Sequence, residues 1–321
     1  MRSRGCAFLT GACALGFAVA TYVSDPSATP SPVDYGVAFP SANLWLPTAL
    51  LSEAAGWLVN LAIAAALILL NRSVNLLRTV SVTYVSLFLL MQAATPELTG
   101  CLRDGLLLGL AVILGMGLLH SCYMRPERTP RVFLAFFMLG AGMLWRYSYA
   151  AFIPAFVAGL GQMRIFSLRS LTAALLGLIA PVWIAVGSGL ADPSQWPVPD
   201  FRFDPVAFLA DRHMRHSLLA GSVALLAVTV FSISDIFKIL SYNAATRAYN
   251  GLLMTITLTV GLLALADWTN LSLYLTLLNA VTACQAGHFL KIHGPHRAYL
   301  PFAGLMIVYF AFYLWNLWVL I

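Results

Sequence analysis

Long runs of apolar residues, separated by short polar segments, occupy most of this chain of 321 residues. A helix needs about 20 apolar residues to cross the roughly 30 Å of hydrocarbon in a bilayer. The pattern therefore predicts an all-α fold, a polytopic transmembrane helix bundle with about eleven spans. The predicted spans are residues 6–23, 47–70, 79–95, 105–123, 132–146, 148–163, 171–190, 217–237, 249–266, 271–290 and 299–320. They leave no room for a folded soluble domain, so residues 1–321 form a single integral membrane domain.

Two parts of this span pattern have alternative interpretations. Residues 6–20 follow Met-Arg-Ser-Arg and resemble a signal peptide, which would leave ten spans after cleavage. We favour an uncleaved anchor, because a first span that stays embedded orients the rest. Residues 132–146 and 148–163 are each about 22–24 Å long as helices. They form either two short crossings or a re-entrant hairpin around Arg146.

Composition and charge support a membrane location. Hydrophobic residues make up 60% of the chain and charged residues 9%, whereas soluble domains are about a quarter charged. The net charge of +6 comes from single basic residues between apolar runs. With the N-terminus in the cytoplasm, thirteen of the 18 basic residues fall inside, as expected for this compartment, and the C-terminus lies outside. The outside residues are Arg103, Arg146, Arg202, Arg212 and Arg215.

Several classes of soluble function are not supported. No basic patch is interleaved with stacking aromatics, so no nucleic-acid partner is predicted. No C-x-x-C pair is present, and the spacing of Asp211, His213 and His216 matches no metal motif. Nucleotide-binding, G-x-S-x-G and H-E-x-x-H motifs are also absent. The sequence therefore predicts no metal and no cofactor.

Ionisable side chains within membrane spans cost the most free energy to bury, so they are the first candidates for function. Arg146 lies in Trp145–Tyr149, where it either clamps a phosphate or carboxylate, with Tyr149 beside it, or reaches the interface among aromatic residues. Candidate catalytic carboxylates are Asp34, in the outer loop 24–46, and Glu53. Glu53 is either a base or ion ligand, or, as we favour, an interfacial residue capping a helix that begins later.

Other polar groups favour structural roles. Asp235 and Lys238 lie three residues apart, a spacing that predicts an ion pair on one helix face. Asp267 marks a span boundary. A polar stripe in span 271–290 predicts either hydrogen bonds to a neighbouring helix or the lining of a polar cavity. Its members are Asn279, Thr282, Gln285 and His288. Gly105 and Gly109 predict close helix packing.

One stretch of the chain resembles a known family. Asn71-Arg72 near the end of a span is followed by the turn Arg125–Arg128, then by RIFSLR at 164–169, and finally by a span with Gly177 and Pro181. This order, over residues 71–187, resembles a family of uncharacterised bacterial multi-pass inner-membrane proteins. The resemblance implies a bacterial cytoplasmic membrane and supplies no catalytic residues.

The outer loop 191–216 gathers acidic, basic and aromatic side chains and is the best single candidate for substrate contact. With Arg146 and Tyr149, its Arg202, Arg212 and Arg215 are predicted to bind substrate. The leading hypothesis is an envelope component that handles a lipid-linked or anionic substrate at the outer face. The alternatives are a non-catalytic subunit of an envelope assembly and a transporter. Predicted partners are membrane lipids and, for the subunit, a membrane protein.

Overall fold

The computed structural model describes residues 37–77, 83–95, 98–99, 101–196 and 212–320, and their secondary structure is helical without a strand. The predicted first span, 6–23, and the predicted site residues Asp34 and Arg202 lie outside these ranges. The α-helices are α2 (Ala49–Val74), α3 (Thr83–Ala93), α4 (Asp104–His120), α5 (Thr129–Met143), α6 (Ile153–Gln162), α7 (Leu168–Gly187), α9 (Arg212–Ile239), α10 (Ala244–Ala266) and α11 (Leu271–Leu320).

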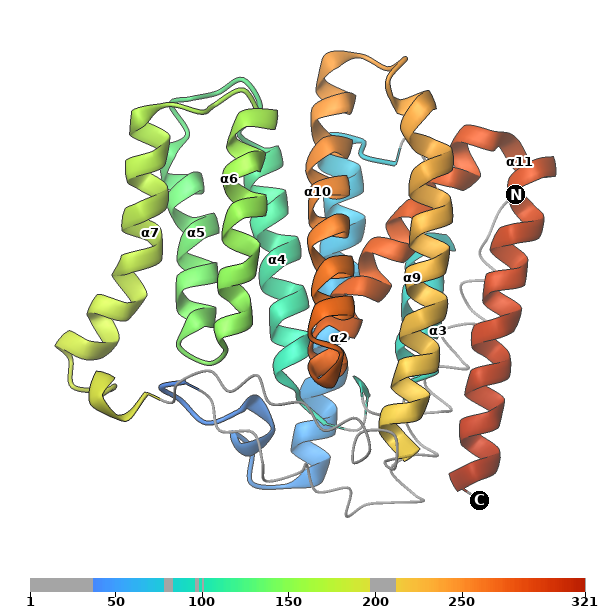
Figure 1. Ribbon diagram of the computed structural model, residues 1–321, viewed down its shortest axis with the longest axis horizontal. Coiled ribbons are helices and arrows are strands. Elements are labelled where there is room, and N and C mark those ends of the chain that lie inside the picture. The colour runs from blue at the N-terminus through green and yellow to red at the C-terminus, as the bar shows by residue number, and fades with distance from the viewer. Residues whose placement is uncertain (1–36, 78–82, 96–97, 100, 197–211, 321) are drawn as a thin grey trace.

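The helices confirm the predicted all-α class. Four of them, α2, α7, α9 and α10, include segments of 20–26 residues that are apolar and long enough to cross a membrane. Figure 1 shows the described helices side by side and roughly parallel to one axis. Successive helices run in opposite directions along that axis, as expected when short connections join antiparallel neighbours.

Helix α11 doubles back on itself. Its Leu271 packs against Gly221 of α9, while its Tyr309 hydroxyl donates to the carbonyl oxygen of Ala220, 2.9 Å away. A straight helix would separate Leu271 and Tyr309 by about 57 Å, so the two contacts require a reversal between them. Figure 1 shows this reversal, with the second half of α11 descending beside α9. The separate predicted spans 271–290 and 299–320 correspond to these two halves.

The short hairpin around Arg146 extends along the whole length of α4. At one end of α4, the Arg128 guanidinium donates to the carbonyl oxygen of Ser121 (2.6 Å). At the other end, Arg146 contacts Asp104. Helix α5, the 3₁₀ turn Tyr147–Phe152 and α6 therefore pass from one end of the bundle to the other and back. This geometry favours two crossings over a re-entrant loop.

Glycines bring pairs of helices close together. A Cβ atom on Gly105 would lie 2.8 Å from the carbonyl oxygen of Ser272, and one on Gly109 would lie 3.0 Å from the Thr276 side chain. These contacts confirm the predicted packing role of the two residues, here between α4 and α11. Helices α5 and α7 approach even more closely, at Gly140 and Gly177.

The polar stripe of α11 is buried, with each of its four side chains at most 1% exposed. Asn279 donates to Gln92 Oε1 of α3 (2.9 Å), and Thr282 contacts the carbonyl oxygen of Ala224 on α9 (3.4 Å). Gln92 in turn donates to Asn60 Oδ1 of α2, 2.7 Å away. The prediction of hydrogen bonds to neighbouring helices is confirmed.

We expect Gln92→Leu to destabilise the protein by about 1–2 kcal/mol, because it leaves the amides of Asn60 and Asn279 without their shared partner. Gln92 is completely buried, so no water replaces the lost bonds. The measurement is unfolding in mixed micelles with increasing anionic detergent. Gln162→Leu, which removes a single bond to Thr255, should cost less. Equal stability of Gln92→Leu and wild type would contradict the network.

The predicted pairing of Asp235 with Lys238 is wrong. The carboxylate of Asp235 is completely buried and faces α11, where its Oδ1 lies 3.7 Å from His293 Nδ1. Lys238, three residues further along α9, is exposed. Helical spacing placed both residues near one face, but the packing of α9 against α11 buried only the carboxylate.

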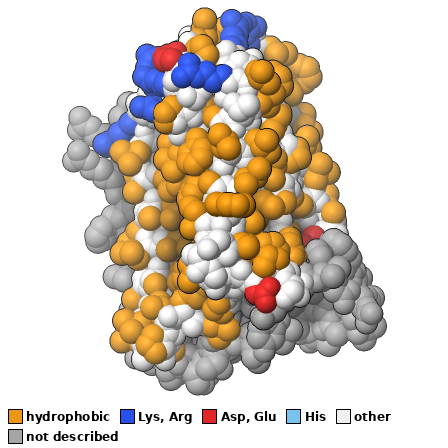
Figure 2. Space-filling model, turned by 90° about the vertical axis from the view of Figure 1, so that its left-hand side faces the viewer, with side chains coloured by type: hydrophobic (Ala, Val, Ile, Leu, Met, Phe, Trp, Pro, Cys, Tyr) orange, Lys and Arg blue, Asp and Glu red, His pale blue; other side chains and the backbone are white. Residues whose placement is uncertain are grey.

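Basic residues gather at one end of the bundle, which Figure 2 shows at the top. We call it the basic end and the opposite end the Asp104 end. The basic end carries Arg72, Arg125, Arg128, Arg131, Arg164, Arg169, Lys238, Arg247 and Lys291. The described basic residues at the Asp104 end are Arg103, Arg146, Arg212 and Arg215.

Candidate functional site

The start of α4 forms the centre of the candidate site. Arg103 is the N-cap residue and has an extended backbone, so Asp104 becomes the first helical residue. A carboxylate in the first turn is favoured by the partial positive charge of the helix N-terminus. Gly105 lets this turn approach the start of α11, because a side chain there would collide with the backbone of Ser272 and Leu273.

Asp104 and Arg146 form an ion pair between α4 and the tip of the α5–α6 hairpin. Arg146 Nε donates to Asp104 Oδ2 at 2.6 Å, with side-chain exposures of 20% and 7%. The other carboxylate oxygen accepts the backbone N–H of Ala42 at 2.8 Å. Arg146 Nη2 also donates to Ser41 Oγ, 3.0 Å away. The pair therefore joins three segments that are far apart in sequence.

The segment before α2 covers this ion pair. The N–H groups of Val37 and Ala38 donate to the carbonyl oxygens of Trp145 (3.0 Å) and Leu144 (2.7 Å). The Trp145 ring contacts the rings of Phe39 and Trp45, each with a centroid separation of 5.5 Å. These contacts hold Ser41 above the guanidinium of Arg146. They also surround Arg146 with aromatic side chains, as the interpretation of Arg146 as an interfacial residue predicted.

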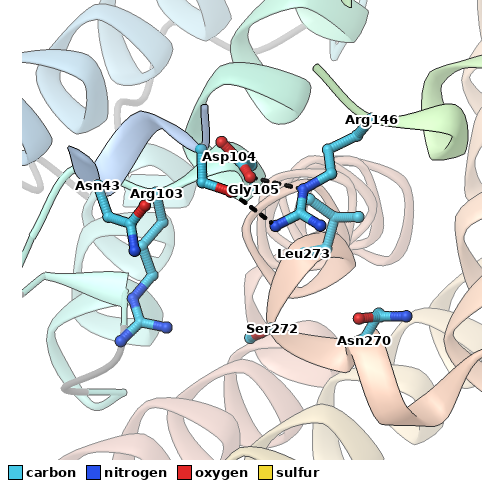
Figure 3. Close-up of a pocket in the computed structure, with 9 residues that line it drawn as sticks. Asn43, Arg103, Asp104, Gly105, Arg146, Asn270, Ser272 and Leu273 are labelled. Carbon is cyan, nitrogen blue, oxygen red and sulfur yellow. Dashed lines mark hydrogen bonds and ion pairs between the residues drawn. The ribbon is translucent and has the colours of Figure 1, made fainter. Parts of the chain in front are cut away.

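A polar cavity of about 50 Å³ opens beside the ion pair. Figure 3 shows Arg103 and Arg146 on opposite sides of it, with Asn270 and Ser272 on a third. Its lining residues are Ser41, Asn43, Arg103, Asp104, Gly105, Arg146, Asn270, Ser272 and Leu273. The Nε of Arg103 and the Oδ1 of Asn43 are buried without a hydrogen-bond partner among the described residues. A group that accepted a bond from Arg103 would satisfy the first of these.

The corner between α10 and α11 fixes the third side of the cavity. Asp267 follows the last residue of α10, which confirms its predicted place at a helix boundary. Its carboxylate accepts bonds from the Asn270 amide (2.9 Å) and the Tyr274 hydroxyl (2.8 Å). The Tyr274 hydroxyl also lies 3.0 Å from Ser148 Oγ of the hairpin. Asn270 is thus held at the cavity by a network that begins on α10.

The chemistry of this arrangement favours binding over proton transfer. Two guanidinium groups and one carboxylate give the cavity a net charge of +1. Both oxygens of Asp104 already accept hydrogen bonds, one from Arg146 and one from Ala42. Asp104 therefore positions Arg146 and is not available as a general base. The remaining donors, above all Arg103, suit an oxygen-rich anion.

The structure separates the residues that the sequence grouped as substrate-binding. Arg146 lines the cavity. Tyr149 does not, because it is 3% exposed and its ring packs against Gly142. Arg215 is exposed on the first turn of α9 and does not line the cavity. Arg212 begins α9, and the structure describes its backbone alone.

The interpretation of Glu53 as a helix cap is wrong. Helix α2 begins at Ala49 and is capped by Thr48, whose side chain accepts the N–H of Leu51 at 3.3 Å. Glu53 is the fifth residue of the helix and is 9% exposed. It does not line the cavity, so the structure gives no support to a shared role with Arg146.

Sequence reasoning missed Asp104 and named Arg103 only as an outside charge. The dipeptide Arg103-Asp104 stands directly before an apolar run that begins with Gly105. The available indication was a carboxylate at the start of one apolar run, together with an arginine in the turn that follows the next apolar run.

No protein-family model matches the chain, and no significant match was found among curated proteins or solved structures.

Proposed function

We propose that this chain is a multi-pass protein of a bacterial cytoplasmic membrane, with about eleven spans. In this topology the basic end faces the cytoplasm and the Asp104 end faces outward, because cytoplasmic loops carry the excess of arginine and lysine. The alternating direction of the described helices supports the count, provided that the predicted span 6–23 precedes them. The N-terminus is then cytoplasmic and the C-terminus is outside.

We further propose that the chain binds the anionic head of a lipid-linked envelope substrate in the cavity between Arg103 and Arg146. One observation carries this proposal. Arg103 presents a buried Nε without a partner to a cavity whose other arginine is already oriented by Asp104. A buried donor left unsatisfied costs about 1–3 kcal/mol, so a ligand that accepts from it gains that amount.

The size of the cavity limits what it can hold. One water needs about 10–15 Å³ of such space, so a cavity of about 50 Å³ accepts a few waters or one small oxyanion. A phosphate or carboxylate head fits, while a sugar or a lipid chain must remain outside. The bilayer beside the bundle would hold an attached chain, which is why a lipid-linked ligand suits the site better than a soluble one.

The test is native mass spectrometry of the protein in nanodiscs containing a polyprenyl phosphate. We expect a one-to-one adduct that Arg103→Gln weakens at least tenfold, the effect of losing a charged hydrogen bond of about 1.4 kcal/mol or more. Arg103 is a better position for this substitution than Arg146. Removing Arg146 would leave the Asp104 carboxylate unpaired, whereas removing Arg103 leaves no described carboxylate unpaired.

Arg215→Gln is the matched control, since Arg215 is an exposed arginine at the same end of the bundle. It should bind as wild type does. The uncharged polyprenol should show no adduct, and inorganic phosphate in excess should displace the lipid if the head alone is recognised. Equal binding by Arg103→Gln and Arg215→Gln would refute the proposed site.

A non-catalytic membrane subunit is the second candidate, and α7 favours it. This helix packs chiefly against α5, and only 28% of its apolar window is buried, against 39–44% for the other long spans. Its Trp183 is 75% exposed. A protein partner on this face would appear as a stoichiometric complex in the same spectra. The transporter alternative loses its motivation, because the α11 polar stripe is bonded between helices and does not line the cavity between Arg103 and Arg146.

A further inference from the structure

Asp235 is the most deeply buried carboxylate among the described residues, and the anion site makes no use of it. Its exposure is 0%, and neither of its oxygens has a hydrogen-bond partner among those residues. It lies in the last two turns of α9, near the basic end. An ionised carboxylate in such a place is costly, because it has lost its hydration and gained no donor in return.

The packing of α9 against the first half of α11 creates this environment. The tilted rings of Phe231 and Phe289 pack against each other across the two helices, with centroids 4.9 Å apart. One turn further along both helices, Asp235 faces His293 at 3.7 Å. The His293 ring also packs against Phe289 in a tilted arrangement, with a centroid distance of 4.3 Å. The carboxylate therefore lies one turn beyond an aromatic pair and faces an imidazole.

Among the described residues, the charged side chains of the surrounding elements lie at the rim, from which the Lys238 ammonium attracts an ionised carboxylate through space. Lys238 of α9, Lys291 of α11 and Arg247 of α10 are all exposed. Arg247 donates to the carbonyl oxygen of Leu240 (3.4 Å). On the α11 side the buried His288 stacks with Tyr242 at 6.4 Å. Within the described part of the chain, His293 is thus the titratable group at ion-pair distance from Asp235.

We propose that Asp235 and His293 form a proton-binding site, in which Asp235 is a neutral carboxylic acid at neutral pH. A neutral acid with a neutral imidazole buries no charge. The alternative, an ion pair, would need hydrogen bonds to the carboxylate that the 3.7 Å separation does not provide. His293 is 18% exposed, so the site communicates with the basic end. This inference does not depend on the anion site at the Asp104 end.

The direction of the pH response follows from this assignment. As pH rises, the carboxyl releases its proton to water and leaves one negative charge in the buried site. Because the imidazole is already neutral at that pH, its removal alone should change this response little, whereas a permanent cation at position 293 would favour the ionised carboxylate.

Infrared spectroscopy of the whole chain in nanodiscs tests this assignment through the C=O band of protonated carboxyls. At neutral pH we expect such a band in wild type and its loss in Asp235→Asn, which has the same shape as the neutral acid. Glu127→Gln, which removes an exposed carboxyl at the same end, should leave the band unchanged. His293→Lys, which places a cation at ion-pair distance from the carboxyl, should lower the pH at which the band disappears by about one unit or more.

Two results would overturn the proposal. Identical neutral-pH spectra for wild type and Asp235→Asn would mean that Asp235 is ionised. An unchanged midpoint in His293→Lys would mean that the side chain at position 293 does not lie beside the carboxyl. The histidine variant keeps the carboxyl and its band, so it remains informative even if Asp235→Asn folds poorly.

Discussion

Arg146→Ala is expected to destabilise the protein by about 3 kcal/mol, near the lower limit for removing one partner of a buried ion pair. The lower limit applies because the Arg146 side chain is 20% exposed and partly screened by water. Its loss leaves the carboxylate of Asp104, which is 7% exposed, with the Ala42 N–H as its one remaining donor. The loss of stability therefore comes more from the unpaired charge of Asp104 than from the lost contact.

A double variant separates these two contributions. The double variant Arg146→Ala, Asp104→Asn has no unpaired carboxylate at position 104. It should therefore recover more than half of the stability that Arg146→Ala alone loses. Unfolding in mixed micelles provides the free energies, and the two single variants complete the thermodynamic cycle. Arg215→Ala, an exposed arginine at the same end, should change stability by less than about 0.5 kcal/mol.

Two outcomes would contradict the buried-pair interpretation. Arg146→Ala could prove as stable as Arg215→Ala, or the double variant could lose the sum of both single effects. The same variants also distinguish stability from binding. Arg103→Gln is expected to weaken the anion adduct without a comparable loss of stability, since Arg103 makes no ion pair among the described residues.

The helices themselves could be predicted because one apolar run corresponds to one element. Predicted span 249–266 matches α10 (Ala244–Ala266), and predicted span 105–123 matches α4. The main difference lies in α11, where helical residues continue through the reversal that the sequence divides into two spans. Hydropathy marks where the chain leaves the apolar layer, but it does not report whether the turn keeps helical hydrogen bonds.

The polar contacts could not be predicted in the same way, because they depend on how helices are placed side by side. Arg146 meets Asp104 across 42 residues of sequence. Asp235 meets His293 because α9 and the first half of α11 run parallel, with Phe231 and Phe289 one turn earlier. The spacing of Asp235 and Lys238 on one helix was the visible pattern, and it carried no information about the neighbouring helix.

The described polar side chains are distributed by depth in a manner that fits the proposed topology. The middle of the bundle contains neutral amides that bond one another, such as Gln92 with Asn279. The ion pair of Asp104 with Arg146 and the proposed proton-binding pair of Asp235 with His293 lie toward opposite ends. Neutral groups cost less than charges at the centre of a bilayer. Charge is therefore available where a ligand or a proton can reach it from water.

Gly177→Leu is expected to destabilise the protein by about 3 kcal/mol or more, the upper part of the range for overpacking. A Cβ atom on Gly177 of α7 would overlap the carbonyl oxygen of Phe133 on α5. One on Gly140 of α5 would lie 2.5 Å from the carbonyl oxygen of Leu178 on α7. Backbone atoms cannot move aside as side chains do, so the two helices must separate. Because α7 packs chiefly against α5, the separation should release the whole helix.

Unfolding in mixed micelles measures the loss, and trypsin cleavage at Arg164 or Arg169, the exposed arginines that flank the start of α7, should become faster. Gly177→Ala isolates the steric collision better than Gly177→Leu does. Alanine gains up to about 1 kcal/mol of helix propensity over glycine, so a net destabilisation can come only from the collision. Gly187→Ala, at the end of the same helix with nothing within 4 Å of the new Cβ, is the control and should be neutral or stabilising. A Gly177→Ala protein as stable as Gly187→Ala would mean that α5 and α7 are not in backbone contact.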